Sequence, residues 1–158
     1  MLTDGVADAS GPIASDGKYL DIWWRGKNVN AGLMLALAVL LQRGGGDGDP
    51  KAIRVNTIVR RRTPSEVEES MSEFLRSARV NAETRILVSD GRPFADTIRE
   101  GSSDAAISFV GLRAPEPDES AAEYAAYFRL LCANLRGMPP VAFVLAAEDV
   151  DFRRIFEN

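Results

Sequence analysis

The stretch YLDIWWRGKNVNAGLMLALAVLLQ, residues 19–42, decides the fold of this chain. Its first part, Tyr19–Trp24, is apolar and rich in strand-forming residues, and turn residues bound it on both sides; this pattern predicts a buried strand. Its second part, Gly32–Leu41, is an unbroken apolar run of helix formers that Asn28 or Asn30 can cap. A buried strand that leads into such a helix is typical of an α/β domain, with the strand central in a parallel sheet.

The rest of the chain repeats this strand–helix unit. We expect strands at Ala52–Val59, Thr84–Ser89, Asp104–Leu112 and Val141–Ala146, and helices after Thr63, at Phe94–Glu100, at Glu119–Arg136 and after Asp149. Alternating strands and helices with short connections favour right-handed crossovers. The sequence therefore predicts a five-stranded doubly wound parallel sheet, ordered 3-2-1-4-5, with helices on both faces.

Length and composition predict one domain. The chain has 158 residues, of which 46% are hydrophobic, which is enough for a single core. Residues 1–17 are rich in Gly, Ala, Ser and Asp without periodicity, so we interpret them as a linker or disordered leader and place the domain at 18–158. No apolar run reaches the length of about 18 residues that a membrane span requires, so we expect no membrane insertion of this chain.

Charge and residue usage exclude several functions. The net charge of −4 argues against nucleic acid as a partner. The chain contains no histidine and one cysteine, Cys132, so it lacks the commonest general base and metal ligand and cannot form an internal disulfide. We therefore predict no enzyme activity, no metal site and no cofactor.

A ligand crevice is the remaining chemical candidate. In a doubly wound sheet, ligands bind beyond the carboxyl ends of the strands where the strand order reverses, here between the first and fourth strands. Arg25, Lys27 and Arg113 follow those strands and form a candidate anion site, although such residues often only solvate loop tips. Neither loop has the glycine pattern of a phosphate-binding loop, so we expect no tight binding of adenine nucleotides.

Thr63 and Ser65 are candidate phosphorylation sites because they follow three arginines at 60–62. The alternative is structural: Thr63 is the N-cap of the next helix, and Pro64 is its first residue. Glu66, at the third helical position, completes a capping box with Thr63. The capping box explains Thr63 without a kinase, and we favour it.

The helix at Gly32–Leu41 predicts an interface. On a wheel of about 100° per residue, Leu35 and Val39 lie opposite the side that holds most of the large apolar residues, which we expect to face the sheet. A helix apolar all round is usually covered all round. We therefore expect Leu35 and Val39 to contact a second copy or another protein, or else the chain's own N-terminal segment or last helix.

Three segments resemble a known family. DIWW at 21–24 with the helix that follows resembles the D-x-W-W strand, turn and Leu-rich helix of the cytosolic C-terminal domain of the cation–chloride cotransporter family. DAAISFVGLRAPEP at 104–117, followed by Tyr124 and Phe128, resembles a strand, Pro-rich loop and helix of the same family, and VAFVLAAEDVDF at 141–152 resembles its next strand and turn. The likeness spans 19–157 but not the turn at 25–30, whose residues differ from the family's.

The resemblance implies a non-catalytic regulatory or assembly domain with a fold like that of universal stress proteins. Its partners would be the transmembrane part of the same transporter and a second copy in a homodimer, at the cytoplasmic side of the membrane. The chain lacks the family's long inserts, which suggests a prokaryotic relative. Amino acid permeases carry similar tails, so the resemblance leaves the transported species open. The alternative is a free-standing nucleotide-binding protein of the universal stress type.

Overall fold

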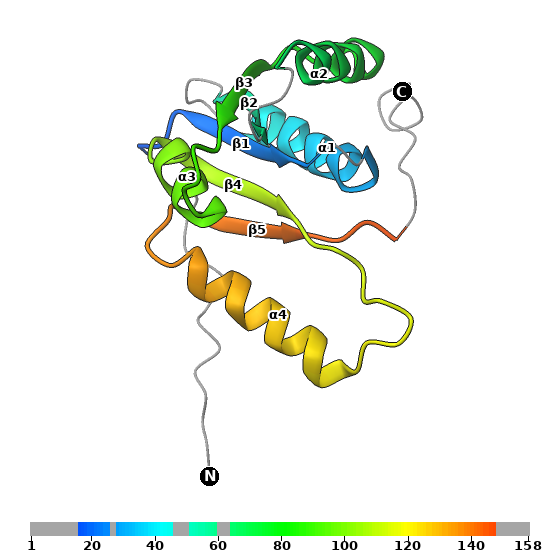
Figure 1. The fold of residues 1–158 in the computed structure, drawn as a ribbon. Coiled ribbons are helices and arrows are strands. Elements are labelled where there is room, and N and C mark those ends of the chain that lie inside the picture. Colours follow the sequence, from blue (N-terminus) through cyan, green and yellow to red (C-terminus); the bar gives the residue numbers. More distant parts are fainter. Residues whose placement is uncertain (1–15, 26–27, 46–50, 60–63, 148–158) are drawn as a thin grey trace.

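Five parallel strands form one sheet in the order β3-β2-β1-β4-β5 (Figure 1). The computed structural model describes residues 16–25, 28–45, 51–59 and 64–147. The strands are β1 (Tyr19–Trp24), β2 (Ala52–Val59), β3 (Glu83–Val88), β4 (Ala105–Gly111) and β5 (Val141–Val144). The predicted α/β fold, strand number and strand order are confirmed. The likeness to universal stress proteins stays a prediction.

Four described helices connect the strands: α1 (Asn28–Gly44), α2 (Pro64–Ala78), α3 (Phe94–Gly101) and α4 (Ala121–Asn134). Helices α1 and α2 cover one face of the sheet, and α3 and α4 lie on the other side (Figure 1). α4 begins at a capping box, in which Ser120 Oγ accepts a hydrogen bond from the Glu123 amide and the Glu123 carboxylate accepts from the Ser120 amide. The helix predicted after Asp149 lies outside the described residues.

Successive side chains of a strand point to opposite faces of the sheet, so the domain has one core on each face. Leu20, Ile22 and Trp24 of β1 pack with α1 and α2 residues such as Met34 and Met71. Trp23 points to the other face and packs with α3 and the end of α4 through a smaller cluster. This period of two is the geometry of a strand buried on both faces, as the apolar sequence of β1 predicts.

The predicted orientation of α1 is wrong. Leu35 is 0% exposed and Val39 is 5% exposed, and both belong to the core against the sheet, whereas Leu40 is 55% exposed. The side of α1 that faces the sheet also carries Ala31 and Ala38, both buried; small side chains there let the helix approach the strands closely. The number of large leucines on one side of α1 therefore did not identify the side that faces the sheet. Leu35 and Val39, which were predicted to form an interface, belong to the core of the domain itself.

The start of the fold is set by Gly17. A Cβ atom at Gly17 would lie 2.3 Å from the Cα of Ala106, so the backbone there passes too close to β4 for any side chain. The Gly17 carbonyl oxygen accepts a hydrogen bond from Lys51 Nζ at 2.5 Å. The chain thus contacts the sheet one residue before the predicted start of the domain at 18. Within the described ranges, no helix is long and apolar enough to cross a membrane.

Candidate functional site

The side chain of Asn30 lies beside the switch point between β1 and β4, where it is hydrogen-bonded to the residues that follow β4 and β5. Its Nδ2 donates a hydrogen bond to the Leu112 carbonyl oxygen at 2.6 Å, and its Oδ1 accepts one from the Ala146 amide at 2.8 Å. Asn30 also lies against Gly111, where a Cβ atom would approach Nδ2 to 3.0 Å. One amide in the first turn of α1 therefore connects the ends of β4 and β5.

Arg113 is turned away from the crevice and toward the loop before α4. Its guanidinium pairs with the Glu119 carboxylate and lies over the Tyr127 ring, 4.3 Å from the ring centroid. The hydrogen bonds between the two groups raise the pKa of Arg113 and lower the pKa of Glu119. Arg113 is thus engaged within its own loop and is not part of an anion site with Arg25.

Arg25 takes a different position from Arg113. Its guanidinium lies 4.9 Å from the centroid of the Phe94 ring at the start of α3. Lys27 and Thr63 lie outside the described residues, and Ser65 is exposed in the first turn of α2. The structure therefore separates the two described residues of the predicted crevice, and phosphorylation of Thr63 or Ser65 stays a prediction.

An open cleft lies along the carboxyl edge of β1, β2 and β3, which the sequence did not predict. It has a volume of about 1010 Å³. Its floor is formed by the ends of those strands, including Trp24 and Thr57–Val59; one wall is α2, and the other includes Arg25, Arg92 and Phe94. Because α2 and α3 cover opposite faces of the sheet, the cleft opens between them at its edge.

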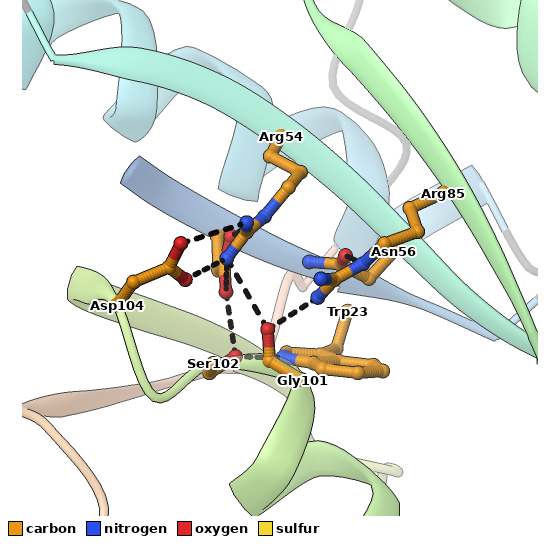
Figure 2. Close-up of polar contacts among 8 residues, drawn as sticks. Trp23, Arg54, Asn56, Arg85, Gly101, Ser102 and Asp104 are labelled. Atoms are coloured by element: carbon orange, nitrogen blue, oxygen red, sulfur yellow. Dashed lines mark hydrogen bonds and ion pairs between the residues drawn. The ribbon is translucent and has the colours of Figure 1, made fainter. Parts of the chain in front are cut away.

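A buried charged cluster occupies the α3 side of the sheet. Arg54 is 5% exposed and donates to both carboxylate oxygens of Asp21, at 2.7 and 3.0 Å. Asp21 is 0% exposed and also accepts a hydrogen bond from Ser102 Oγ at 2.6 Å. Ser102 Oγ in turn accepts one from Trp23 Nε1 at 2.9 Å (Figure 2). The Asp and the first Trp of the DIWW motif therefore meet at one serine after α3.

The same cluster fastens the C-terminal end of α3. The Gly101 carbonyl oxygen accepts hydrogen bonds from Arg85 Nη2 and from Arg54 Nη2, the latter at 3.2 Å (Figure 2). Asp104 adds a second carboxylate, 2.7 Å from Arg54 Nη2. Cations at the C-terminal end of a helix stabilise its exposed carbonyl groups. The cluster thus acts as a clamp between α3 and the strands β1, β2 and β3.

Charge is balanced within the clamp. Burial alone would lower the pKa of Arg54, but the hydrogen bonds and charges of Asp21 and Asp104 outweigh it and raise that pKa. The hydrogen bond from Arg54 lowers the pKa of Asp104. Burial, and then the charge of Arg54, lowers the pKa of Arg85. Two carboxylates and two guanidiniums face one another, so this arrangement serves as a structural ion network rather than a reactive site.

Strand register was the signal that could have revealed the clamp. Asp21 and Arg54 are each the third residue of an otherwise mostly apolar strand, and they are paired in the register of β1 and β2. Asn56 is paired in the same way with Arg85, whose Nε donates to Asn56 Oδ1 at 2.9 Å. Aligning the predicted strands by their charged residues would have brought these side chains together.

In the part of the chain that the structure describes, no group of three or more Cys, Asp or Glu side chains is placed to hold a metal ion. No protein-family model matches the chain, and no curated protein is significantly similar to it in sequence. The likeness to the cation–chloride cotransporter domain therefore stays a prediction carried by the residues themselves.

Proposed function

We propose that this chain is a non-catalytic regulatory or assembly domain of a membrane transporter, of the cation–chloride cotransporter type or a related permease. The observation that carries the proposal is the Asn30 side chain beside the switch point, where it is hydrogen-bonded to the residues that follow β4 and β5. Doubly wound enzymes bind substrates and cofactors at that position. A side chain that makes structural hydrogen bonds beside this position favours a scaffold role over a catalytic one.

The DIWW motif supports the same function. Asp21 and Trp23, which carry much of the resemblance, are both buried and are used to hold α3 on the sheet. A family that shares this motif would therefore share a way of fixing a helix rather than a chemical reaction. A motif that only holds a helix on the sheet is what we expect in a regulatory or assembly domain.

Helix α4 supports an assembly role. None of its residues is fully buried, and Leu130 and Phe128 are 62% and 37% exposed. Leu130 is the most exposed large apolar side chain among the described residues, which favours a contact between this helix and another protein surface. In the proposed setting, the partners are the transmembrane part of the same transporter, at the cytoplasmic side of the membrane, and a second copy of the domain.

The reading frame upstream of residue 1 tests the transporter proposal. A series of apolar segments, each of about 20 residues, followed directly by this domain would support it. A stop codon in frame, with a start at Met1, would overturn it.

A nucleotide-binding protein of the universal stress type is the second candidate, favoured by the open cleft at the carboxyl ends of β1–β3. We expect titration calorimetry with ATP and ADP at millimolar concentration to show no tight binding, because Asn30 and the Pro-rich loop after β4 occupy the position of a phosphate loop. A universal stress protein that binds ATP is the positive control. A micromolar dissociation constant would favour this second candidate over the first.

A further inference from the structure

We propose that the open cleft between α2 and the start of α3 binds a small zwitterion, a molecule of the α-amino acid class that carries both an ammonium and a carboxylate. The inference deepens the proposed function, since it rests on a regulatory role and names the class of signal. Its volume of about 1010 Å³ is at the upper end of the range for small-molecule sites, which runs from about 300 to 1,000 Å³.

The two walls of the cleft carry opposite charges. On the α2 side, Glu66 and Glu73 line the cleft and lie seven residues apart, which is about two helical turns and places them on one face of the helix. On the α3 side, Arg25 and Arg92 line it. A purely anionic ligand would be opposed by the first wall and a purely cationic one by the second.

Arg25 and Glu73 line opposite walls of the cleft and do not form an ion pair with each other. Among the described residues, neither of them makes an ion pair with another side chain. Arg25 is instead held over the Phe94 ring, and Arg92 pairs with Glu100 outside the cleft at 2.6 Å. A ligand that carries both charges would satisfy Arg25 and Glu73 together, the carboxylate by the two-pronged contact that guanidinium groups favour.

Apolar and hydroxyl groups complete the lining. Val67 and Phe94 offer surface to an aliphatic or aromatic side chain, while Ser70 offers a hydroxyl group. A few polar groups that fix orientation, set among apolar groups that provide contact area, are the usual composition of a small-molecule site. The combination fits an amino acid with a large apolar side chain better than a nucleotide, for which this lining offers no phosphate cradle.

Binding is tested with the whole chain and the standard α-amino acids at millimolar concentration, by thermal melting and then calorimetry. We expect at least one apolar amino acid to raise the melting temperature. Its analogue without the amino group and its analogue without the carboxylate should each bind about tenfold more weakly or worse. For leucine these analogues are 4-methylpentanoate and 3-methylbutylamine.

Matched variants locate the site. Arg25→Gln and Glu73→Gln are both at exposed positions, so we expect folded proteins with at least about tenfold weaker binding of the amino acid. Glu69→Gln, on α2 outside the cleft lining, and Arg129→Gln, on α4, should bind like the wild type. The proposal is overturned if no amino acid binds, or if both single-charge analogues bind as tightly as the amino acid itself. It is also overturned if Arg25→Gln and Glu73→Gln leave the affinity for the amino acid unchanged. These outcomes do not depend on what lies upstream of residue 1, so this proposal and the transporter proposal fail separately.

Discussion

Asp21 is a carboxylate in the middle of a central strand, with no exposed surface. An isolated charge in such a position would be prohibitively costly, and it is stable only because Arg54 and Ser102 donate hydrogen bonds to it. Breaking a buried pair by removing one partner costs about 3–5 kcal/mol. Residues that are far apart in the sequence thus become interdependent once the strands align.

The neighbouring tryptophans allow a matched test of one hydrogen bond. Trp23 Nε1 donates to Ser102, whereas Trp24 Nε1 is buried with no partner in the described part of the chain. Trp23→Phe and Trp24→Phe remove similar volume, but only the first breaks a hydrogen bond and leaves the serine without its donor. We expect Trp23→Phe to lower the free energy of unfolding by about 1–3 kcal/mol more than Trp24→Phe, measured in urea. Equal losses would show that the bond to Ser102 contributes nothing.

Asp104 should make the protein sensitive to acid. Its hydrogen bond from Arg54 lowers its pKa in the folded state, so its contribution to stability is fully present above the pKa of an unfolded aspartate, about 3.9, and is lost as the pH falls below that value. We expect the urea midpoint to fall between roughly pH 5 and pH 2 less steeply in Asp104→Asn than in the wild type. An identical pH dependence in both proteins would exclude this contribution.

At the scale of elements, periodicity and turn residues predicted the strands well. β2 has the predicted bounds, and β3 and β4 differ from them by one residue at each end. The strands are short apolar runs between turn residues, so their limits follow from the sequence alone. The face of α1 does not, because a helix without a polar stripe has no preferred outer side until the shape of the sheet selects one.

The corrected orientation of α1 gives a test with an internal control. Leu35 is fully buried and Leu40 is mostly exposed. We expect Leu35→Ala to lower the free energy of unfolding by about 2–5 kcal/mol through lost contacts and a cavity, and Leu40→Ala to change it by about 0.5 kcal/mol or less. Chemical denaturation measures both. The reverse order would restore the orientation that the helical wheel predicted.

At the scale of the whole molecule, the sequence predicted where the switch point lies but not which side chains lie beside it. The strand order placed Arg25 and Arg113 near the switch point, yet Arg113 turns to Glu119 and Asn30 lies beside the switch point. Asn30 had a local explanation as a helix cap, and its partners Leu112 and Ala146 are far along the chain. The open cleft was also missed, because its walls come from α2 and the start of α3, which meet only in three dimensions.

Asn30 should govern how firmly the end of β5 is held. Asn30→Ala removes both hydrogen bonds, whereas Asn30→Asp keeps an oxygen that can accept from the Ala146 amide and loses the donor to Leu112. We expect hydrogen exchange at the Ala146 amide to accelerate strongly in Asn30→Ala and to stay close to the wild-type rate in Asn30→Asp. Equal acceleration in both variants would show that the donor to Leu112 is the important half.

The clamp has a consequence for how the sheet assembles. Parallel apolar strands can pair in several offsets with similar contact area, and a chain can become trapped in such offsets during folding. Shifting β2 by two residues against β1 would leave each strand's faces unchanged, but it would place Arg54 opposite Trp23 or Tyr19 in place of Asp21. Such an offset leaves a carboxylate and a guanidinium mismatched in the interior. The buried ion pair therefore selects the native register of β1 and β2, because an offset register leaves both charges unpaired and is too unstable to persist.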